Sequence, residues 1–418
     1  MSRLTPFVLG AVLASGGLAA PAAATPPPYQ PCPIAKVSPT PPAPKPSPVP
    51  THDPNLPAIG GDGLATTGLT VPPEAPPPPS TLSAKAWLVA DLDTGAVLGA
   101  CAPHAYAAPA SLQKLLLAQT VLPKLDPATV VTVTAADLAF EPGSSAVGLL
   151  QGGRYPVATL WLGLLLNSGN DAANVLARLG GGPAGVPGTI AAMNAEARRL
   201  GAFDTHAETP SGLDGPGQVT SVYDLALISR ALFDRPDFRR YAATLTTKIP
   251  AQPPKDPRGF QIQNDNKLLF NYPGALGGKT GFTDIARHTF VGAAQRDGRR
   301  LVVTMLNAEH KPVRTWQQAA ALLDWGFSVP SDASVGRLIT PEEAATAPTP
   351  GSSPSPNAAA AMGAGATTGT SSPKRMVLIG VGSIGSLFVL VWLGVLVAAR
   401  RRRAANRRAA QAASSPGS

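Results

Sequence analysis

A serine and a lysine three residues apart are the first residues of this chain whose spacing suggests chemistry. Ser111 and Lys114 stand at the start of an apolar, helical run, Pro109 to Ala118. On a helix, residues i and i+3 share a face, so the Lys114 amine can reach the Ser111 hydroxyl. A serine hydroxyl becomes a good nucleophile when a base takes its proton. A lysine can be that base when burial or a neighbouring positive charge keeps it neutral.

Two further short motifs follow this pair. Ser168-Gly169-Asn170 separates two predicted helices, and Lys279-Thr280-Gly281 precedes a predicted β-hairpin. Each motif has an ordinary explanation when it stands alone, as part of a helix, a loop or an edge strand. It is improbable that all three motifs occur by chance in this order, each with the expected secondary-structure elements around it. The three motifs therefore predict one active site.

The motifs resemble those of penicillin-binding proteins and class A β-lactamases. From about residue 83 to 330, the chain resembles the D-alanyl-D-alanine carboxypeptidases among the low-molecular-mass penicillin-binding proteins. The segments that carry the resemblance are Pro109 to Ser111 with Lys114, Ser168 to Ala173, Ser211 to Asp214, Asn264 to Leu269 and Lys279 to Asp284. The resemblance implies an α+β fold of the penicillin-binding protein/β-lactamase type, in which helices flank an antiparallel sheet and an all-α subdomain is present.

The resemblance also implies a reaction and its catalytic residues. Ser111 would attack the carbonyl between the two terminal D-alanines of a peptidoglycan stem peptide, and Lys114 would take its proton. Ser168 would relay a proton to the leaving amine, and Asn170 would hold the substrate amide. Water would then release the acyl-enzyme without any cofactor. β-Lactam antibiotics, which mimic the acyl bond, would acylate Ser111 and act as covalent inhibitors.

The third motif would bind the substrate. Lys279 and Thr280 would hold the terminal carboxylate, while Gly278 and Gly281 would leave room for a substrate chain along the strand edge. The backbone N–H groups of Ser111 and Phe282 would form an oxyanion hole.

Several elements must position these motifs. A first hairpin is predicted from strands at 86–91 and 96–100, and a second from strands at 288–294 and 301–306 with Asp297-Gly298 in its turn. A short β-branched run occupies 130–133. Helices are predicted at 157–166, from 171, at 189–200, from 221 and at 313–327. We therefore expect a catalytic domain at 84–330.

The N-terminal region has the pattern of a secreted protein. Residues 1–24 contain a basic start at Arg3, an apolar stretch from Phe7 to Leu18 and small residues up to Ala24, where we expect cleavage of a signal peptide. Residues 25–83 contain many of the 47 prolines of the chain and predict an extended, disordered linker.

The C-terminal region predicts a membrane anchor. Residues 331–373 are a low-complexity linker. Residues 376–399 carry no charge and are long enough to cross a bilayer as one transmembrane helix. Four arginines follow at once and begin a basic tail at 400–418, so the positive-inside bias places the C-terminus in the cytoplasm. We expect the catalytic domain to be held on the outer face of the membrane.

The two cysteines, Cys32 and Cys101, are an even number in a chain with a predicted extracellular location. Disulfides persist in such oxidising compartments. Our hypothesis is a Cys32–Cys101 disulfide that joins the N-terminal linker to the first hairpin. The alternative is two unpaired thiols.

The charge of the chain argues against a nucleic-acid partner. The net charge is +9, but eight basic residues and no acid follow residue 373, so the catalytic domain is close to neutral. The five histidines show no spacing typical of a metal site. Gly278-Lys279-Thr280 does not complete a phosphate-binding loop, because Pro273 occupies the position of the required first glycine.

Three alternatives to a carboxypeptidase remain open. A DD-endopeptidase would share the same motifs. A serine β-lactamase needs rapid deacylation, and Glu196 and Glu208 are the only glutamates between Ser168 and Lys279. A non-catalytic wall-binding or β-lactam-sensing module is possible on the same fold, although such a module would not need Lys114.

Overall fold

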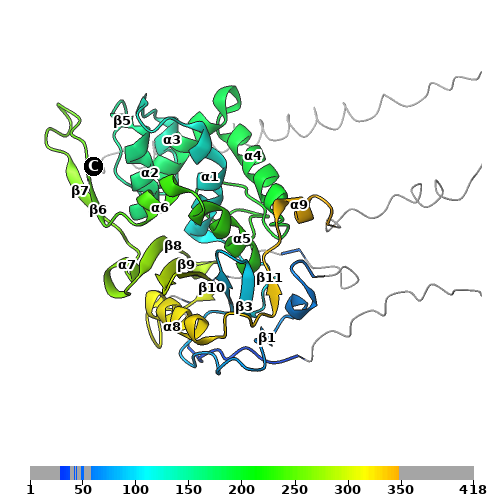
Figure 1. The fold of residues 1–418 in the computed structure, drawn as a ribbon. Coiled ribbons are helices and arrows are strands. Elements are labelled where there is room, and N and C mark those ends of the chain that lie inside the picture. Colours follow the sequence, from blue (N-terminus) through cyan, green and yellow to red (C-terminus); the bar gives the residue numbers. More distant parts are fainter. Residues whose placement is uncertain (1–28, 38–41, 43, 45–48, 51–57, 348–418) are drawn as a thin grey trace, which may run out of the picture. The chain divides into compact units, whose positions relative to one another are not determined.

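The computed structural model describes residues 29–37, 42, 44, 49–50 and 58–347 (Figure 1). The predicted signal peptide, transmembrane helix and basic tail all lie outside the described residues. Among the described helices, none combines the length and apolarity that a bilayer crossing requires.

A seven-stranded antiparallel sheet forms the centre of the domain (Figure 1). Its strand order is β1 (Leu69–Thr70), β3 (Ala96–Cys101), β2 (Ala86–Asp91), β10 (Arg299–Ala308), β9 (Arg287–Arg296) and β8 (Ala275–Thr283), with β11 (Gly336–Arg337) paired to β3. Both predicted hairpins are confirmed. The Lys-Thr-Gly motif lies in β8, which among the described strands pairs with β9 alone and so forms an edge of the sheet.

The interior strands are covered on both faces, which explains their continuous apolar sequences. On one face, Trp87 of β2 meets Trp325 of α8 (Thr315–Ser328) edge to face, with ring centroids 5.8 Å apart. On the other face, the Thr304 hydroxyl of β10 donates to the Val222 carbonyl at the start of α5 (Val222–Phe233). Ser221 caps α5 by accepting a hydrogen bond from the backbone N–H of Asp224.

A helical subdomain lies on the α5 side of the sheet (Figure 1). Helix α1 runs through its centre and packs against α3, α4 and α5. The elements of this part are α1 (Gln113–Val121), α2 (Val157–Leu166), α3 (Asn170–Gly180), α4 (Gly185–Leu200) and α6 (Pro236–Ala242), with two small sheets, β4 (Val130–Thr132) with β5 (Arg154–Pro156) and β6 (Thr246–Ile249) with β7 (Phe260–Gln263). The expected α+β fold is thus observed, whereas the subdomain that was expected to be all-α also contains two small sheets.

The folded region extends beyond the predicted limits of 84–330. The short helix η1 (Asp62–Leu64) and β1 precede it, and β11 and α9 (Pro341–Ala344) follow it. Composition misled the prediction here, because prolines and small residues surround a few apolar anchors. Leu64 and Leu338 are each 1% exposed, and the Pro76 carbonyl accepts a hydrogen bond from the Trp325 indole. Parts of both predicted linkers therefore pack on the domain.

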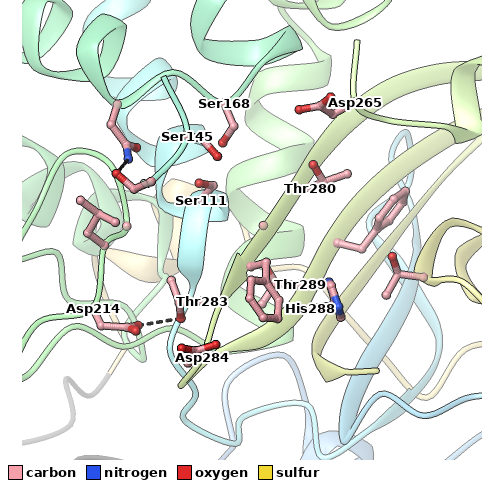
Figure 2. Close-up of a pocket in the computed structure, with 18 of the residues that line it drawn as sticks. Ser111, Ser145, Ser168, Asp214, Asp265, Thr280, Thr283, Asp284, His288 and Thr289 are labelled. Atoms are coloured by element: carbon pink, nitrogen blue, oxygen red, sulfur yellow. Dashed lines mark hydrogen bonds between the residues drawn. The ribbon is translucent and has the colours of Figure 1, made fainter. Parts of the chain in front are cut away.

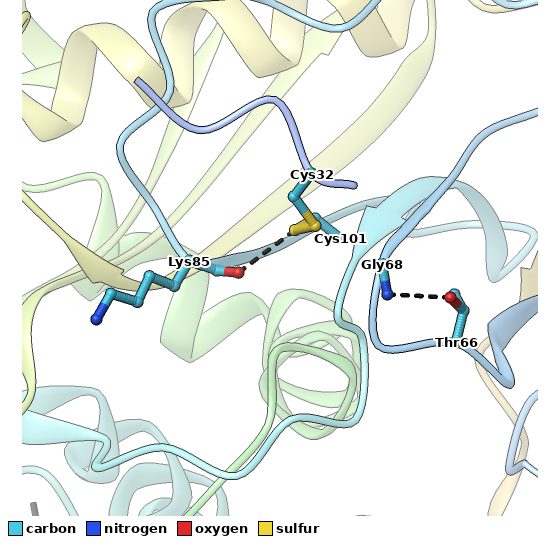
Figure 3. Close-up of a disulfide and its surroundings, with 5 residues drawn as sticks. All are labelled: Cys32, Thr66, Gly68, Lys85 and Cys101. Atoms are coloured by element: carbon cyan, nitrogen blue, oxygen red, sulfur yellow. Dashed lines mark hydrogen bonds between the residues drawn. A yellow bond between two sulfur atoms is a disulfide. The ribbon is translucent and has the colours of Figure 1, made fainter. Parts of the chain in front are cut away.

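A disulfide joins Cys32 to Cys101 at the end of β3, the pairing expected from the sequence (Figure 3). Two backbone hydrogen bonds hold the segment 29–37 beside it, from Leu69 N–H to the Gln30 carbonyl and from Ala35 N–H to the Leu82 carbonyl. This segment is therefore attached to the edge of the sheet formed by β1.

Candidate active site

The three motifs meet in one cleft of about 640 Å³ between the helical subdomain and the edge strand β8 (Figure 2). Six of the eight predicted catalytic and substrate-binding residues line this cleft: Ser111, Ser168, Asn170, Thr280, Gly281 and Phe282. The other two, Lys114 and Lys279, are completely buried behind its walls. The fold thus brings all eight predicted residues together at one site.

Ser111 lies in the short helix η2 (Ala110–Leu112), which leads directly into α1. Ala110 before it has φ 48°, a left-handed conformation that costs energy for a residue with a side chain. The Thr289 hydroxyl of β9 donates to the Pro109 carbonyl at 3.1 Å. The turn is therefore attached to the sheet, and Ser111 is presented at the start of the helix.

Lys114 has three polar neighbours at hydrogen-bond distance. Its Nζ lies 2.8 Å from Ser111 Oγ, 2.8 Å from Asn170 Oδ1 and 2.7 Å from the Ser211 carbonyl oxygen. Burial lowers the Lys114 pKa well below its usual value, and the nearby Lys279 charge lowers it further. Asp171 acts in the opposite direction and raises this pKa.

The neighbours of Lys114 determine how its neutral form would be oriented. A neutral amine has two N–H groups and one lone pair. The carbonyl oxygens of Asn170 and Ser211 can only accept hydrogen bonds, so they engage the two N–H groups. The lone pair then faces the Ser111 hydroxyl, which is the geometry that proton abstraction requires.

Ser168 and Asn170 lie on the wall opposite β8. Ser168 has φ 57°, and its buried hydroxyl has no hydrogen-bond partner among the described residues. Asn170 begins α3, and its amide nitrogen donates to Ser144 Oγ at 2.9 Å. Ser168 therefore brings an unsatisfied hydroxyl to the cleft, whereas Asn170 is fixed on both sides by Lys114 and Ser144.

Lys279 lies on β8, where it is paired with Val291 of β9. Its Nζ donates to the Thr280 carbonyl at 2.6 Å. Burial lowers the Lys279 pKa to about 8, while the charge of Asp265 opposes this shift. Asp265 lines the same cleft (Figure 2). Lys279 is thus a buried ammonium group with capacity for a further acceptor.

Gly278 and Gly281, two of the three glycines of β8, have different functions in the structure. A Cβ on Gly281 would lie 2.4 Å from Thr289 Oγ1 and 2.9 Å from the Ser111 backbone nitrogen, so this glycine permits β8 to approach Ser111 closely. A Cβ on Gly278 would collide with the Val291 carbonyl at 2.0 Å. The prediction that Gly278 makes room for substrate was wrong, because its absent side chain makes room for β9.

An aromatic group lies beside Phe282 at the rim of the cleft. The exposed Phe282 ring is 4.6 Å from the His288 ring, which stacks on His310 at 3.5 Å. The Arg287 guanidinium lies 5.4 Å from the Phe282 centroid and pairs with Glu309. Burial and the His310 charge lower the His288 pKa to about 4. The contacts of the two histidines were not predicted, because they depend on the exact register of the β8–β9 and β9–β10 strand pairs.

Other residues of the site were missed for related reasons. Ser211 and Asp265 fell within segments that carried the family resemblance, but no role was assigned to them. Ser144 and Ser145 lie in a loop without a recognisable pattern. His104, a lone loop histidine in the sequence, is held away from the cleft by Asp204 and the Ile59 carbonyl. Within the ranges that the structure describes, no cluster of side chains is suited to hold a metal ion.

Comparison with known proteins identifies relatives of this chain. Residues 72–310 match the family model of the D-alanyl-D-alanine carboxypeptidases, peptidase family S11. The chain is 47% identical over 260 residues to the D-alanyl-D-alanine carboxypeptidase DacB2 of Mycobacterium tuberculosis, an alignment that covers 61% of this chain and 86% of that protein. It is 38% identical over 282 residues to DacD of Salmonella typhimurium, covering 65% and 67%.

Solved structures agree with the sequence relatives. A D-alanyl-D-alanine carboxypeptidase from Mycobacterium tuberculosis H37Rv matches with a TM-score of 0.60 and 44% identity, covering 64% of this chain and all of the other. The Streptomyces K15 DD-transpeptidase matches with a TM-score of 0.57 and 28% identity, covering 60% and 99%. The chain therefore belongs to the D-alanyl-D-alanine carboxypeptidase family, peptidase family S11.

Proposed function

We propose that this protein is a serine-type D-Ala-D-Ala carboxypeptidase that removes the terminal D-Ala from peptidoglycan stem peptides through an acyl-enzyme on Ser111. The observation that carries the proposal is the position of the buried Lys114 amine, 2.8 Å from Ser111 Oγ. Its lowered pKa favours the neutral form that can take a proton. Membership of the carboxypeptidase family supports the choice of substrate.

The first step is acylation. Ser111 Oγ attacks the carbonyl carbon of the penultimate D-Ala, while its proton passes to Lys114 Nζ. The backbone N–H groups of Ser111 and Phe282 stabilise the oxyanion, and each such donor can contribute about 10²–10³ in rate. The close approach of Gly281 to the Ser111 nitrogen supports this assignment, since it brings β8 beside the nucleophile.

Departure of D-Ala completes acylation. The C–N bond breaks, and the leaving amine receives a proton from Lys114 through the Ser168 hydroxyl. Ser168 suits this relay because its buried hydroxyl has no other partner among the residues that the structure describes. Asn170 holds the substrate amide in place. A water molecule then adds to the ester carbonyl, Ser111 leaves with a proton, and the shortened peptide is released.

Recognition of the terminal carboxylate falls to Lys279 and Thr280 on β8. Lys279 donates to one acceptor among the described residues, the Thr280 carbonyl, so N–H groups remain for the substrate. The Thr280 side chain lines the cleft beside it (Figure 2). β-Lactam antibiotics with a carboxylate would use the same contacts and acylate Ser111.

A β-lactamase is less well supported than a carboxypeptidase. Glu196 accepts hydrogen bonds from Gln119 and Arg199, and Glu208 contacts His206. Neither glutamate lines the cleft. Glu196 and Glu208, the two candidates for activating the water that deacylates a β-lactamase, therefore bind other side chains outside the cleft. A DD-endopeptidase would use the same residues on a cross-linked substrate.

We further propose that the protein is secreted by a signal peptide at residues 1–24 and anchored by a transmembrane helix at 376–399, with its C-terminus in the cytoplasm. The uncharged run and the arginines after it support this arrangement. Protease treatment of intact cells should remove the catalytic domain and spare an epitope on the C-terminal tail. Loss of the epitope would contradict this orientation.

The activity is tested by D-Ala release from diacyl-Lys-D-Ala-D-Ala, with the full-length protein beside Ser111→Ala. We expect release by the wild type alone, and covalent labelling of the wild type alone by a fluorescent penicillin. Labelling without D-Ala release would indicate a β-lactam-sensing module instead. Rapid turnover of the penicillin would favour a β-lactamase, and cleavage of cross-linked dimers into monomers without release of D-Ala would favour an endopeptidase.

A further inference from the structure

Asp171, the residue after Asn170, is a buried acid to which the proposed mechanism assigns no role. Its side chain is 1% exposed, and none of the described basic residues forms an ion pair with it. A buried carboxylate needs compensation by hydrogen bonds. The geometry of Asp171 therefore calls for an explanation.

The carboxylate of Asp171 binds a loop of the cleft wall. Oδ1 accepts the backbone N–H of Val147 at 2.9 Å, and Oδ2 accepts those of Gly148 and Leu149, each at 2.9 Å. Oδ1 also accepts from the N–H of Ala172 at 2.8 Å. Three successive N–H groups of the loop thus converge on one side chain at the start of α3.

The same loop contacts Asn170 directly. The Asn170 backbone N–H donates to the Ser145 carbonyl at 2.9 Å, and the Asn170 amide donates to Ser144 Oγ at 2.9 Å. Asn170 Oδ1 in turn accepts from Lys114. A displacement of the loop would therefore move Asn170, and through the Asn170 side chain it would also move the Lys114 amine.

Gly169 makes this arrangement possible. A Cβ at Gly169 would lie 2.4 Å from Val147 Cγ2, 2.7 Å from Asp171 Oδ1 and 3.0 Å from the Val147 nitrogen. The middle residue of Ser168-Gly169-Asn170 thus leaves the space in which the loop meets the carboxylate. The motif includes a structural requirement as well as two reactive side chains.

We infer that Asp171 is a positioning residue for the proposed reaction: it fixes the loop 144–149 against the start of α3 and so holds Asn170 and Lys114 in register with Ser111. The inference rests on the proposed function of the site. It assigns to Asp171 no contact with substrate.

The charge of Asp171 provides a readout that a purely structural residue would lack. Two charged groups act on the Lys114 pKa, Lys279 from β8, which lowers it, and Asp171 from α3, which raises it. The reaction needs neutral Lys114, so activity rises with pH through this pKa. Removal of the Asp171 charge lowers the pKa and moves the acid limb of the pH profile to lower pH.

The test uses three variants of the full-length protein. In Asp171→Asn we expect kcat to fall about 10- to 100-fold through misplacement of Asn170, and the acid limb to move to lower pH. In Gly169→Ala we expect a similar fall in kcat without a shift of the limb. Asp137→Asn is the matched control, because Asp137 is also buried in this subdomain but pairs with Arg178. It should lower thermal stability and leave the limb unmoved.

Each outcome decides the inference. An unmoved acid limb in Asp171→Asn, or wild-type kcat in Gly169→Ala, would overturn it. If Asp171→Asn does not fold, as judged by near-ultraviolet circular dichroism, the kcat of folded Gly169→Ala decides alone. The rate of labelling by a fluorescent penicillin, measured against pH, reports Lys114 independently of D-Ala release. A wild type that is labelled but releases no D-Ala would therefore remove the proposed function, and the pH dependence of labelling in Asp171→Asn would still decide the role of Asp171.

Discussion

Two lysines occupy the two walls of the cleft, and both are completely buried. Lys114 on α1 has three polar neighbours around its amine: two carbonyl oxygens, which accept hydrogen bonds, and the hydroxyl of Ser111, the proposed nucleophile. Lys279 on β8 has one acceptor among the described residues, the Thr280 carbonyl. Residue type and burial are the same, so the difference in role arises from the neighbours.

The neighbouring charges reinforce this difference. Lys279 is among the causes that lower the Lys114 pKa, whereas Asp265 opposes the fall of the Lys279 pKa. One lysine is thereby favoured as a neutral base and the other as a cation near neutral pH. The comparison teaches that the same residue type, lysine, can serve as a base or as an anion-binding group, depending on which charges lie next to it in the cleft.

The largest expected effect is that of Lys114→Met, which keeps the apolar stem and removes the base. We expect kcat/KM for D-Ala release to fall about 10²–10⁴-fold. The rate of acylation by a fluorescent penicillin should fall with it. The exposed Lys124 of the following turn offers a control, and Lys124→Met should retain the wild-type rate. Acylation of Lys114→Met at the wild-type rate would show that another group takes the proton.

Lys279→Met should act on binding first. Loss of the ammonium removes a charge-assisted hydrogen bond to the substrate carboxylate, so KM should rise about 10- to 100-fold. The Lys114 pKa should also rise, because a positive neighbour that lowers it is gone, and the acid limb should move to higher pH. Steady-state kinetics across pH measure both effects. An unmoved acid limb would break the proposed coupling between the two lysines.

The wild-type pH profile should be bell-shaped. On the acid side, activity rises as Lys114 loses its proton. On the alkaline side, Lys279 loses its charge at about pH 8, so kcat/KM should fall about tenfold per pH unit above that value. A substrate that ends in a C-terminal amide has no carboxylate to bind and should lack the alkaline limb. If kcat/KM for the amide substrate falls equally steeply at alkaline pH, a group other than Lys279 causes the alkaline limb.

The smallest expected effect is that of Asp265→Asn. This acid raises the Lys279 pKa, so its neutralisation should move the alkaline limb to lower pH. At pH 7, kcat/KM should stay within about threefold of the wild type, because Asp265 is exposed. Asp284→Asn is the matched control, since Asp284 also lines the cleft but does not act on Lys279. A shift of equal size in both variants would show a general effect of charge in the cleft.

The local patterns of the sequence predicted much of the fold and the site. Alternation of apolar runs and turns placed the strands of both hairpins, and the spacing of Ser111 and Lys114 predicted their contact. The predicted limits of the domain were too narrow at both ends. Residues 58–83 and 331–347 have the composition of linkers, but a few of their apolar side chains pack on the domain. Gly278 was misjudged because its neighbour, the Val291 carbonyl, lies on another strand.

The sequence by itself determined the three motifs and their order, and it predicted the contact of Ser111 with Lys114 and the disulfide, since spacing within one helix and the number of cysteines depend on nothing distant. Only the tertiary structure decided how two buried lysines differ and which carboxylate holds the loop 144–149. Those relations join segments that are far apart in the chain, and a group's pKa depends on the charges and the solvent that folding places around it.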